Sequence, residues 1–330
     1  MLDYTIKMKI NTDNTTEMIT ILKPNLRPNS IKQYEIHLNK LKKIFKSDTY
    51  DFLSNPDEVM DKLSSNHYTS QRNTLNAVII LLLALNEDDK YSELIEEYQL
   101  RRDKLNQQYI KENDKGTVSA SQKSNFVELD EIKNMLKTMD IEIKTRGLKK
   151  KADLSGKEKE LLMVYTIFSM LVKYPVRLDF SGMKLINKTH YNKLKDEDLK
   201  MGNYLVNSKN SLLMIMNEYK TSLKYGQKQI PIDKDIEKII RMYMKATGKS
   251  NGDVLFVSSK NTPLSRNSLS ALLTKTSKLY LNKSISTTLM RKIVVSSTIP
   301  KEVINKQSDL AYIMCHSIEV QNSVYNKSAE

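Results

Sequence analysis

The stretch LVKYPVRLDFSGMKL, which runs from Leu171 to Leu185, marks the place where the sequence pattern changes. Residues 157–172 carry apolar residues at the spacing of a helix, and Pro175 is expected to end that helix. Short apolar segments typical of strands come next, separated by turn residues. The stretch therefore predicts a junction between helix and sheet, with Arg177 in the connection.

Four short strands are predicted beyond this junction, and helical patterns return after Lys234. The strands are expected at Met183–Ile186, Tyr204–Val206, Leu212–Met216 and Gln229–Ile232. The later helices are expected at Ile236–Thr247, Arg266–Leu281, Thr287–Ser297, Lys301–Met314 and Ile318–Lys327. With a further helix at Glu128–Met139 and a basic loop at Lys144–Gly156, residues 127–330 are predicted to form one domain. This domain is expected to be mainly α with a small antiparallel β-sheet, an α+β fold.

A small helical bundle is predicted at residues 1–112. Its helices are expected at Ile31–Phe45 (with Ser30 as N-cap), Pro56–Leu63, Ser70–Leu85 and Ser92–Glu112. The polar sequence NDKGTVSASQKSN begins at Asn113 and predicts a flexible linker over residues 113–126. Two domains also agree with a length of 330 residues, because single cores rarely grow beyond about 250–300 residues.

The charge balance favours a polyanionic partner. The chain has 53 Lys and Arg against 39 Asp and Glu, a formal net charge of +14 and a pI near 9.4. Nucleic acid is the commonest polyanion, although a solvated lysine-rich surface would have the same composition. Candidate DNA contacts are Lys40, Lys42, Lys43, Arg101, Arg102, Lys149, Lys150 and Lys151.

Several classes of protein are disfavoured by composition. A single cysteine, Cys315, allows no intrachain disulfide, and four scattered histidines argue against a zinc site, so no metal is expected. The longest apolar run, Ala77–Leu85, is too short to cross a bilayer, and the first residues lack a signal-peptide pattern. We therefore expect an intracellular protein, in the cytoplasm or nucleus, with no membrane partner. Neither GxxxxGK[ST] nor GxGxxG occurs, so no nucleotide cofactor is expected.

Four segments carry residues that could do chemistry on a phosphate. His316 and Tyr325 lie nine residues apart in CHSIEVQNSVY, where Ser317 could cap a helix. Arg291 stands on an otherwise apolar helix, so it either reaches water at the edge or is held inside for an anion. Arg177 could be braced by Asp179. Each residue taken alone also has an ordinary structural explanation.

A lysine at a hairpin completes this set. The sequence NEYKTSLKYGQKQIPI, which begins at Asn217, has two apolar stretches around a Gly-containing turn, the signature of a β-hairpin. Lys220 stands where the first strand enters the turn and could reach into a groove as a mobile donor. The alternative is that it is one of several solvated turn lysines, together with Lys224 and Lys228.

The order and spacing of these residues resemble the catalytic domain of tyrosine recombinases, the family of phage-type integrases and Xer-like resolvases. The resemblance covers about residues 127–330, and the region before it is similar in pattern to the family's N-terminal core-binding domain. It implies that Arg177, Lys220, Arg291 and His316 match catalytic positions of the family and that Tyr325 matches its nucleophile. The wording PVRLDF, EYKTSLKYG and CHSIEVQNSVY looks closest to recombinases of eukaryotic DNA viruses and virophage- or Polinton-like mobile elements.

The chain departs from the family pattern at two positions. Thr288 stands three residues before Arg291, where the family usually has His, and it cannot carry a proton as imidazole does near pH 7. Asp179 lies two residues after Arg177, whereas an acidic residue three positions after the arginine is commoner in the family. Thr288 therefore leaves open how proton transfer from Tyr325 would be assisted.

The resemblance implies a DNA integrase or recombinase that works through a covalent 3′-phosphotyrosine, without cofactor or metal. Double-stranded DNA is the implied substrate, with self-association into dimers or tetramers on it. Three alternatives remain open from the sequence. They are a catalytically weak or inactive DNA-binding protein of the same fold, a type IB topoisomerase-like strand transferase, and an unrelated basic helical protein.

Overall fold

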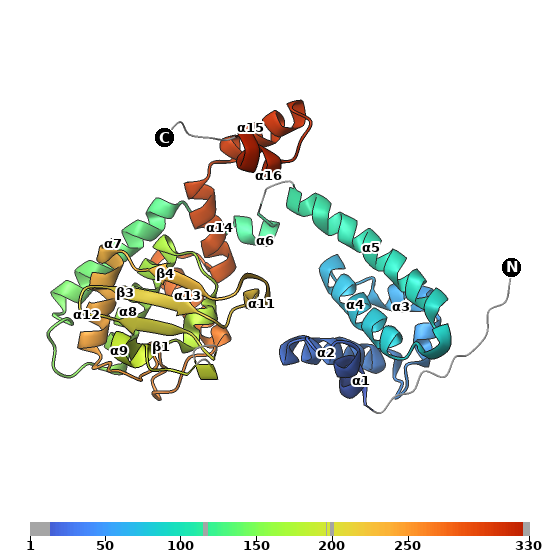
Figure 1. Ribbon diagram of the computed structural model, residues 1–330, viewed down its shortest axis with the longest axis horizontal. Coiled ribbons are helices and arrows are strands. Elements are labelled where there is room, and N and C mark those ends of the chain that lie inside the picture. Colours follow the sequence, from blue (N-terminus) through green and yellow to red (C-terminus); the bar gives the residue numbers. More distant parts are fainter. Residues whose placement is uncertain (1–13, 115–117, 196, 199–200, 326–330) are drawn as a thin grey trace. The chain divides into compact units, whose positions relative to one another are not determined.

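The computed structural model describes residues 14–114, 118–195, 197–198 and 201–325. The chain divides into two compact units, Met1–Thr117 and Val118–Glu330. Each unit has its own buried apolar cluster, and each is described by itself below. The structure is mainly helical with one small sheet, as the sequence predicts (Figure 1).

The first unit is a helical bundle. Its elements are α1 (Thr15–Leu22), α2 (Pro28–Phe45), η1 (Asp51–Ser54), α3 (Pro56–Leu63), α4 (Tyr68–Ala84), η2 (Glu87–Asp89) and α5 (Ser92–Asp114). Helix α4 is apolar in its C-terminal half, and α1, α2 and α5 pack on it. The Tyr98 ring of α5 is fully buried and its hydroxyl donates to the Leu53 carbonyl at 2.9 Å.

Helix α2 begins earlier than the sequence predicts. Its first residue is Pro28, and Ser30, the expected N-cap, lies inside the first turn. Proline fits this position because the first helical N–H needs no partner and the proline φ is already helical. Helix α1, which was not predicted, buries Ile19 against α4.

The second unit is built around α8 (Gly156–Lys173), in which every residue from Leu161 to Leu171 is buried. The helices that pack on it are α7 (Leu129–Thr145), α12 (Lys234–Ala246), α13 (Arg266–Leu281) and α14 (Thr287–Thr298). Ser155 and Glu158 form a capping box that fixes the start of α8. The C-terminal part continues through α15 (Lys301–Ile313), α16 (Ile318–Val320) and η4 (Gln321–Tyr325), a π-helical turn. In Figure 1, α14 leads out of the helical body toward α15 and α16.

The sheet has four strands in the order β1 (Lys184–Asn187), β2 (Tyr204–Asn207), β3 (Leu212–Met216) and β4 (Lys228–Pro231). Short helices lie before β1 and within two of the connections: η3 (Leu178–Gly182) precedes β1, α9 (Lys188–Tyr191) lies between β1 and β2, and α11 (Ser222–Tyr225) lies between β3 and β4. The prediction of an antiparallel sheet was wrong for one pair, because β1 and β2 are parallel. A long connection that includes α9 returns the chain to the start of β2, as parallel pairing requires.

The residues around the expected linker are partly ordered. Helix α5 extends to Asp114, residues 115–117 lie outside the described part, and α6 (Ala120–Lys123) belongs to the second unit. The Lys283 ammonium donates to the Ser124 carbonyl at 2.8 Å, and the Ser284 N–H donates to the Asn125 side chain at 2.7 Å. The C-terminal half of the predicted linker is therefore docked on the loop between α13 and α14. The start of the predicted basic loop also differs, because α7 continues to Thr145.

Candidate active site

Arg177 is placed by the end of α8. Tyr174 is the C-cap of that helix, Pro175 follows, and Arg177 has an extended backbone (φ −71°, ψ 161°) as the N-cap of η3. Its side chain is exposed. Among the described residues, the Arg177 guanidinium forms no ion pair or hydrogen bond. The sequence therefore builds a fixed backbone at this position and leaves the charge available.

The carboxylate of Asp179 is used elsewhere. The sequence suggested that it braces Arg177, but it forms an ion pair with Arg266, with 2.9 Å between Oδ1 and Nη1. The Asp179 side chain is only 3% exposed, so this pair anchors the start of α13 to η3. Arg266 was missed by the sequence analysis because nothing in its local pattern indicates its partner.

Arg291 projects from α14, whose residues Leu289, Met290, Ile293 and Val294 are buried. Its Nε donates to the Thr287 carbonyl at 3.4 Å, and its Nη2 donates to the Thr288 hydroxyl at 3.3 Å. Burial lowers the pKa of the Arg291 guanidinium, repulsion from Arg177 lowers it further, and Asp179 opposes both effects. Thr288 therefore orients the arginine that follows it by one helical turn.

Arg177 and Arg291 line one cavity of about 340 Å³. Asp179, Met216, Tyr219, Thr221 and Lys228 also line it, so the walls carry three basic groups and one carboxylate that is already paired. Two guanidinium groups that repel each other in a half-enclosed space are stabilised by an anion between them. Such an arrangement is suited to a phosphate-like group.

The β3–β4 hairpin brings Lys228 to this cavity. The pairing of Met216 with Lys228 closes the hairpin, and both residues line the cavity wall. The Tyr219 hydroxyl donates to the Gly226 carbonyl at 2.7 Å and holds the turn closed. Lys220, the lysine singled out from the sequence, is exposed and does not line the cavity. The strand register, which the sequence pattern alone does not show, accounts for this difference.

His316 and Tyr325 form a second group. Their rings stack with 5.0 Å between centroids and 12° between planes. Ser317 caps α16 by accepting from the Val320 N–H at 3.2 Å, as predicted, and Tyr325 is the last residue of η4. The His316 Nε2 is buried and has no hydrogen-bond partner within the described part of the chain. Tyr325 is 57% exposed, and neither ring lines the arginine cavity.

Several basic residues named as possible DNA contacts have structural partners. Arg101 pairs with Asp57 and Glu97, Arg102 with Asp103, and Lys149 with Asp140. Lys151 pairs with the buried Glu158, and the Lys42 ammonium lies 4.2 Å from the centroid of the Tyr50 ring. Lys40 donates to Asn66 at 3.4 Å. Lys43 and Lys150 form no ion pair among the described residues, so they remain the freest of this set.

Comparison with known proteins finds similarity in structure but not in sequence. No protein-family profile matches the chain, and no curated protein matches it in sequence. A solved structure described as the crystal structure of XerA recombinase is similar at a TM-score of 0.34 and 12% identity, over 97% of this chain and 95% of that one. Similarity at this level carries no weight for function, which has to be argued from the chain's own residues. In the described ranges of the chain, no helix has the length and apolar character needed to span a bilayer.

Proposed function

We propose that this chain breaks and rejoins DNA strands as a tyrosine recombinase does. One observation supports this above the others: Arg177 and Arg291, from distant parts of the sequence, line the same cavity. Arg177 is unpaired among the described residues, and it lowers the pKa of Arg291. Such a pair is matched to an anion whose charge spreads over two non-bridging oxygens, as in a phosphodiester under attack.

In the proposed reaction the Tyr325 hydroxyl attacks the scissile phosphorus. A P–O bond to the tyrosine forms, the P–O bond to the 5′-oxygen breaks, and the tyrosine proton passes to water or a nearby base. Arg177 and Arg291 hold the non-bridging oxygens through the transition state. The energy of the broken bond is kept in the phosphotyrosine, so a 5′-hydroxyl can later reverse the step and rejoin the strand.

The leaving 5′-oxygen needs a proton, and the hairpin offers two lysines. Lys220 matches the family position, whereas Lys228 is the lysine that lines the cavity. Either ammonium could donate the proton, because a flexible lysine side chain can act as a general acid when it reaches the leaving group. Removing this donor would cost about 10²–10⁴-fold in the cleavage rate.

Tyr325 has to enter the arginine cavity for this chemistry. Its exposed ring, at the end of η4 and outside the cavity, supports a resting state in which the nucleophile is held apart. We propose that DNA binding brings α15–η4 onto the cavity of the same chain or of a second copy. The same movement would bring the buried, unpartnered Nε2 of His316 close to the scissile phosphate.

The proposed substrate is double-stranded DNA, contacted by both units, with self-association on the DNA. The first unit would recognise the site as a core-binding domain. The finer placement, among recombinases of eukaryotic viruses and mobile elements, rests only on the wording PVRLDF, EYKTSLKYG and CHSIEVQNSVY. A type IB topoisomerase would use the same residues, and relaxation of supercoiled DNA of any sequence would favour it.

The test is covalent capture. The protein is incubated with nicked duplex DNA, from which the short cleaved fragment diffuses away, and products are separated on a denaturing gel. A protein–DNA adduct that is absent in Tyr325→Phe supports the proposal, because only the hydroxyl has been removed. Salt-sensitive DNA binding with no adduct from any sequence would instead favour the catalytically inactive DNA-binding protein.

A further inference from the structure

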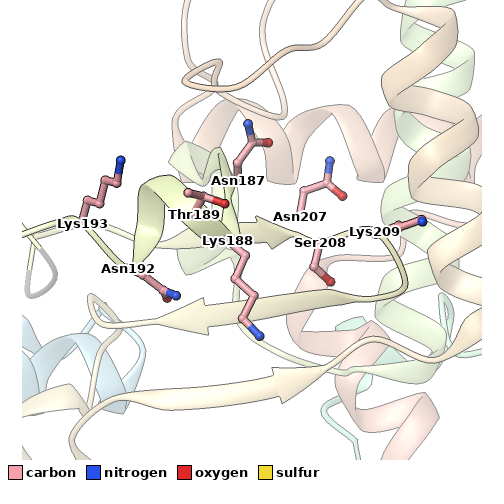
Figure 2. A pocket seen from close by; sticks show the side chains of 8 residues that line it. All are labelled: Asn187, Lys188, Thr189, Asn192, Lys193, Asn207, Ser208 and Lys209. Atoms are coloured by element: carbon pink, nitrogen blue, oxygen red, sulfur yellow. The ribbon is translucent and has the colours of Figure 1, made fainter.

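A second basic pocket lies at the other end of the sheet. It has a volume of about 630 Å³ and is formed where β1 ends at Asn187, where β2 ends at Asn207, and by the start and end of α9. Figure 2 shows its lining side chains, with Lys188 extending between Asn192 and Ser208. Neither the arginine cavity nor the His316–Tyr325 stack shares a residue with it.

The lining of this pocket is cationic and rich in hydrogen-bond donors. Lys188, Lys193 and Lys209 contribute three ammonium groups, and no lining residue is acidic. Within the described ranges these lysines form no ion pair, and the side chains of Asn187 and Asn192 form no hydrogen bond. By contrast, Lys173, Lys234 and Lys238, elsewhere in the same unit, each have a carboxylate partner. Unpaired cations beside amide donors are suited to phosphate oxygens.

The wall of the pocket formed by Asn207 and Ser208 is held in place by Arg241. Arg241 donates to the Asn207 Oδ1 at 2.9 Å and to the Ser208 carbonyl at 2.8 Å, while its Nε is paired with the buried Glu237. Because Arg241 occupies the Asn207 oxygen, the amide N–H₂ of that side chain is the end left for a ligand. The Ser208 and Ser211 hydroxyls also contact each other at 2.7 Å, which fixes the turn between β2 and β3.

The two basic pockets lie diagonally across the sheet. The second pocket is at the β1–β2 end marked by the Asn207–Leu212 pair, and the arginine cavity is at the β3–β4 end marked by Met216 and Lys228. Four residues of strand and about two strand spacings separate them, which is on the order of 15 Å. Each strand of a duplex carries one phosphate for about every 3.4 Å of helix axis, so one duplex can place a phosphate in each pocket.

We infer that the Lys188–Lys193–Lys209 pocket binds a second backbone phosphate of the duplex whose scissile phosphate is held by Arg177 and Arg291. This inference deepens the proposed function, since it names a second contact of the same substrate. It assigns the pocket a sequence-independent role: it would position the duplex and add to affinity without choosing a base.

The test is the salt dependence of binding to a duplex of arbitrary sequence, measured by fluorescence anisotropy. The variant carries Lys188→Gln, Lys193→Gln and Lys209→Gln. A matched control, Lys245→Gln with Lys260→Gln and Lys278→Gln, removes the same charge from lysines that also lack an ion pair among the described residues. We expect the slope of log K against log salt to fall by about 2–3 in the pocket variant, with affinity at 0.1 M salt at least about tenfold weaker.

The outcomes separate the inference from the enzyme activity. An unchanged slope, an equal change in the control variant, or no duplex binding by the unmodified chain would overturn the inference. Calorimetry with inorganic phosphate tests whether the ligand is free phosphate instead of DNA. If the pocket variant loses phosphate binding while the salt slope of DNA binding is unchanged, the pocket is a site for free phosphate and the inference is overturned. If the unmodified chain forms the covalent adduct but the pocket variant has an unchanged salt slope, only the inference about the pocket fails. If the salt slope changes but no adduct forms, only the proposed catalysis fails.

Discussion

The buried carboxylate of Asp179 pairs with Arg266 at 2.9 Å and leaves Arg177, two residues before it, without an ion pair among the described residues. An aspartate beside an arginine would ordinarily neutralise it. Here the fold turns the carboxylate toward α13, so Arg177 faces Arg291 across the cavity. The two guanidinium groups repel each other, and an anion bound between them relieves this repulsion.

Replacing either arginine of the cavity should slow cleavage, and replacing Arg177 should do so without lowering the stability of the fold. Arg177→Gln and Arg291→Gln are each expected to lower the rate of adduct formation by about 10²–10³-fold, because a donor to the transition-state charge is lost. The melting temperature should not fall in Arg177→Gln, since the change removes a repulsion and no ion pair. Single-turnover cleavage and thermal denaturation in the same buffer measure the two effects. A large loss of stability with unchanged cleavage would contradict this assignment.

Thr288 is expected to act by orienting Arg291. Its hydroxyl accepts from the Arg291 Nη2 at 3.3 Å. Thr288→Val keeps the shape and removes the acceptor, so cleavage should slow by roughly 5–10-fold, the value of one hydrogen bond of about 1 kcal/mol. Thr287→Val is the matched control, because only the backbone carbonyl of Thr287 contacts Arg291. Equal rates for both variants and the unmodified chain would remove Thr288 from the site.

The two hairpin lysines can be distinguished by the leaving group. Lys228 lines the cavity and Lys220 does not, so Lys228→Ala is expected to slow cleavage more than Lys220→Ala. When sulfur replaces the bridging 5′-oxygen of the substrate, the 5′-thiolate leaves without needing a proton. This substrate should therefore restore the cleavage rate of the variant that has lost the general acid. If the sulfur substrate restores the cleavage rate of Lys220→Ala alone, Lys220 is the general acid, and the hairpin must rearrange when DNA binds.

Glu158 should make the second unit sensitive to acid. Hydrogen bonds from Lys151 and from the Ser155 N–H lower the pKa of this carboxyl to about 2 from 4.5. Because the folded pKa is below the unfolded one, the stabilisation is complete above pH 4.5 and is lost as the pH falls toward about 2. Glu158→Gln should therefore be less stable than the unmodified chain at pH 7, with the difference shrinking below pH 4.5. Glu160→Gln, an exposed change on the same helix, is the control in urea denaturation.

Most of the helices could be predicted because the spacing of apolar residues and the capping residues lie within or beside each helix. Helix α3 begins and ends as expected, and α13 matches over its whole length. The direction of β1 relative to β2 could not be predicted, because side-chain alternation is the same in parallel and antiparallel strands. Helix α9 was missed because its four residues are too short for a periodic pattern.

The candidate site was predictable only in part. Arg177 was singled out at the junction of helix and sheet and Arg291 on an otherwise apolar helix, and the structure puts both in one cavity. Arg266 and Lys228 were not, since their positions depend on an ion pair with a distant residue and on strand register. The catalytic roles themselves, including that of Tyr325, stay predictions.

The most direct test identifies the residue that carries DNA after cleavage. A library of nicked duplexes with randomised sequence is incubated with the full chain, covalent complexes are isolated under denaturing conditions, and the modified peptide is located by mass spectrometry after protease and nuclease digestion. The account predicts a nucleotide on Tyr325, none in Tyr325→Phe, and a strongly reduced yield in Arg177→Gln and Arg291→Gln. A nucleotide on another residue, or an adduct that persists in Tyr325→Phe, would contradict it.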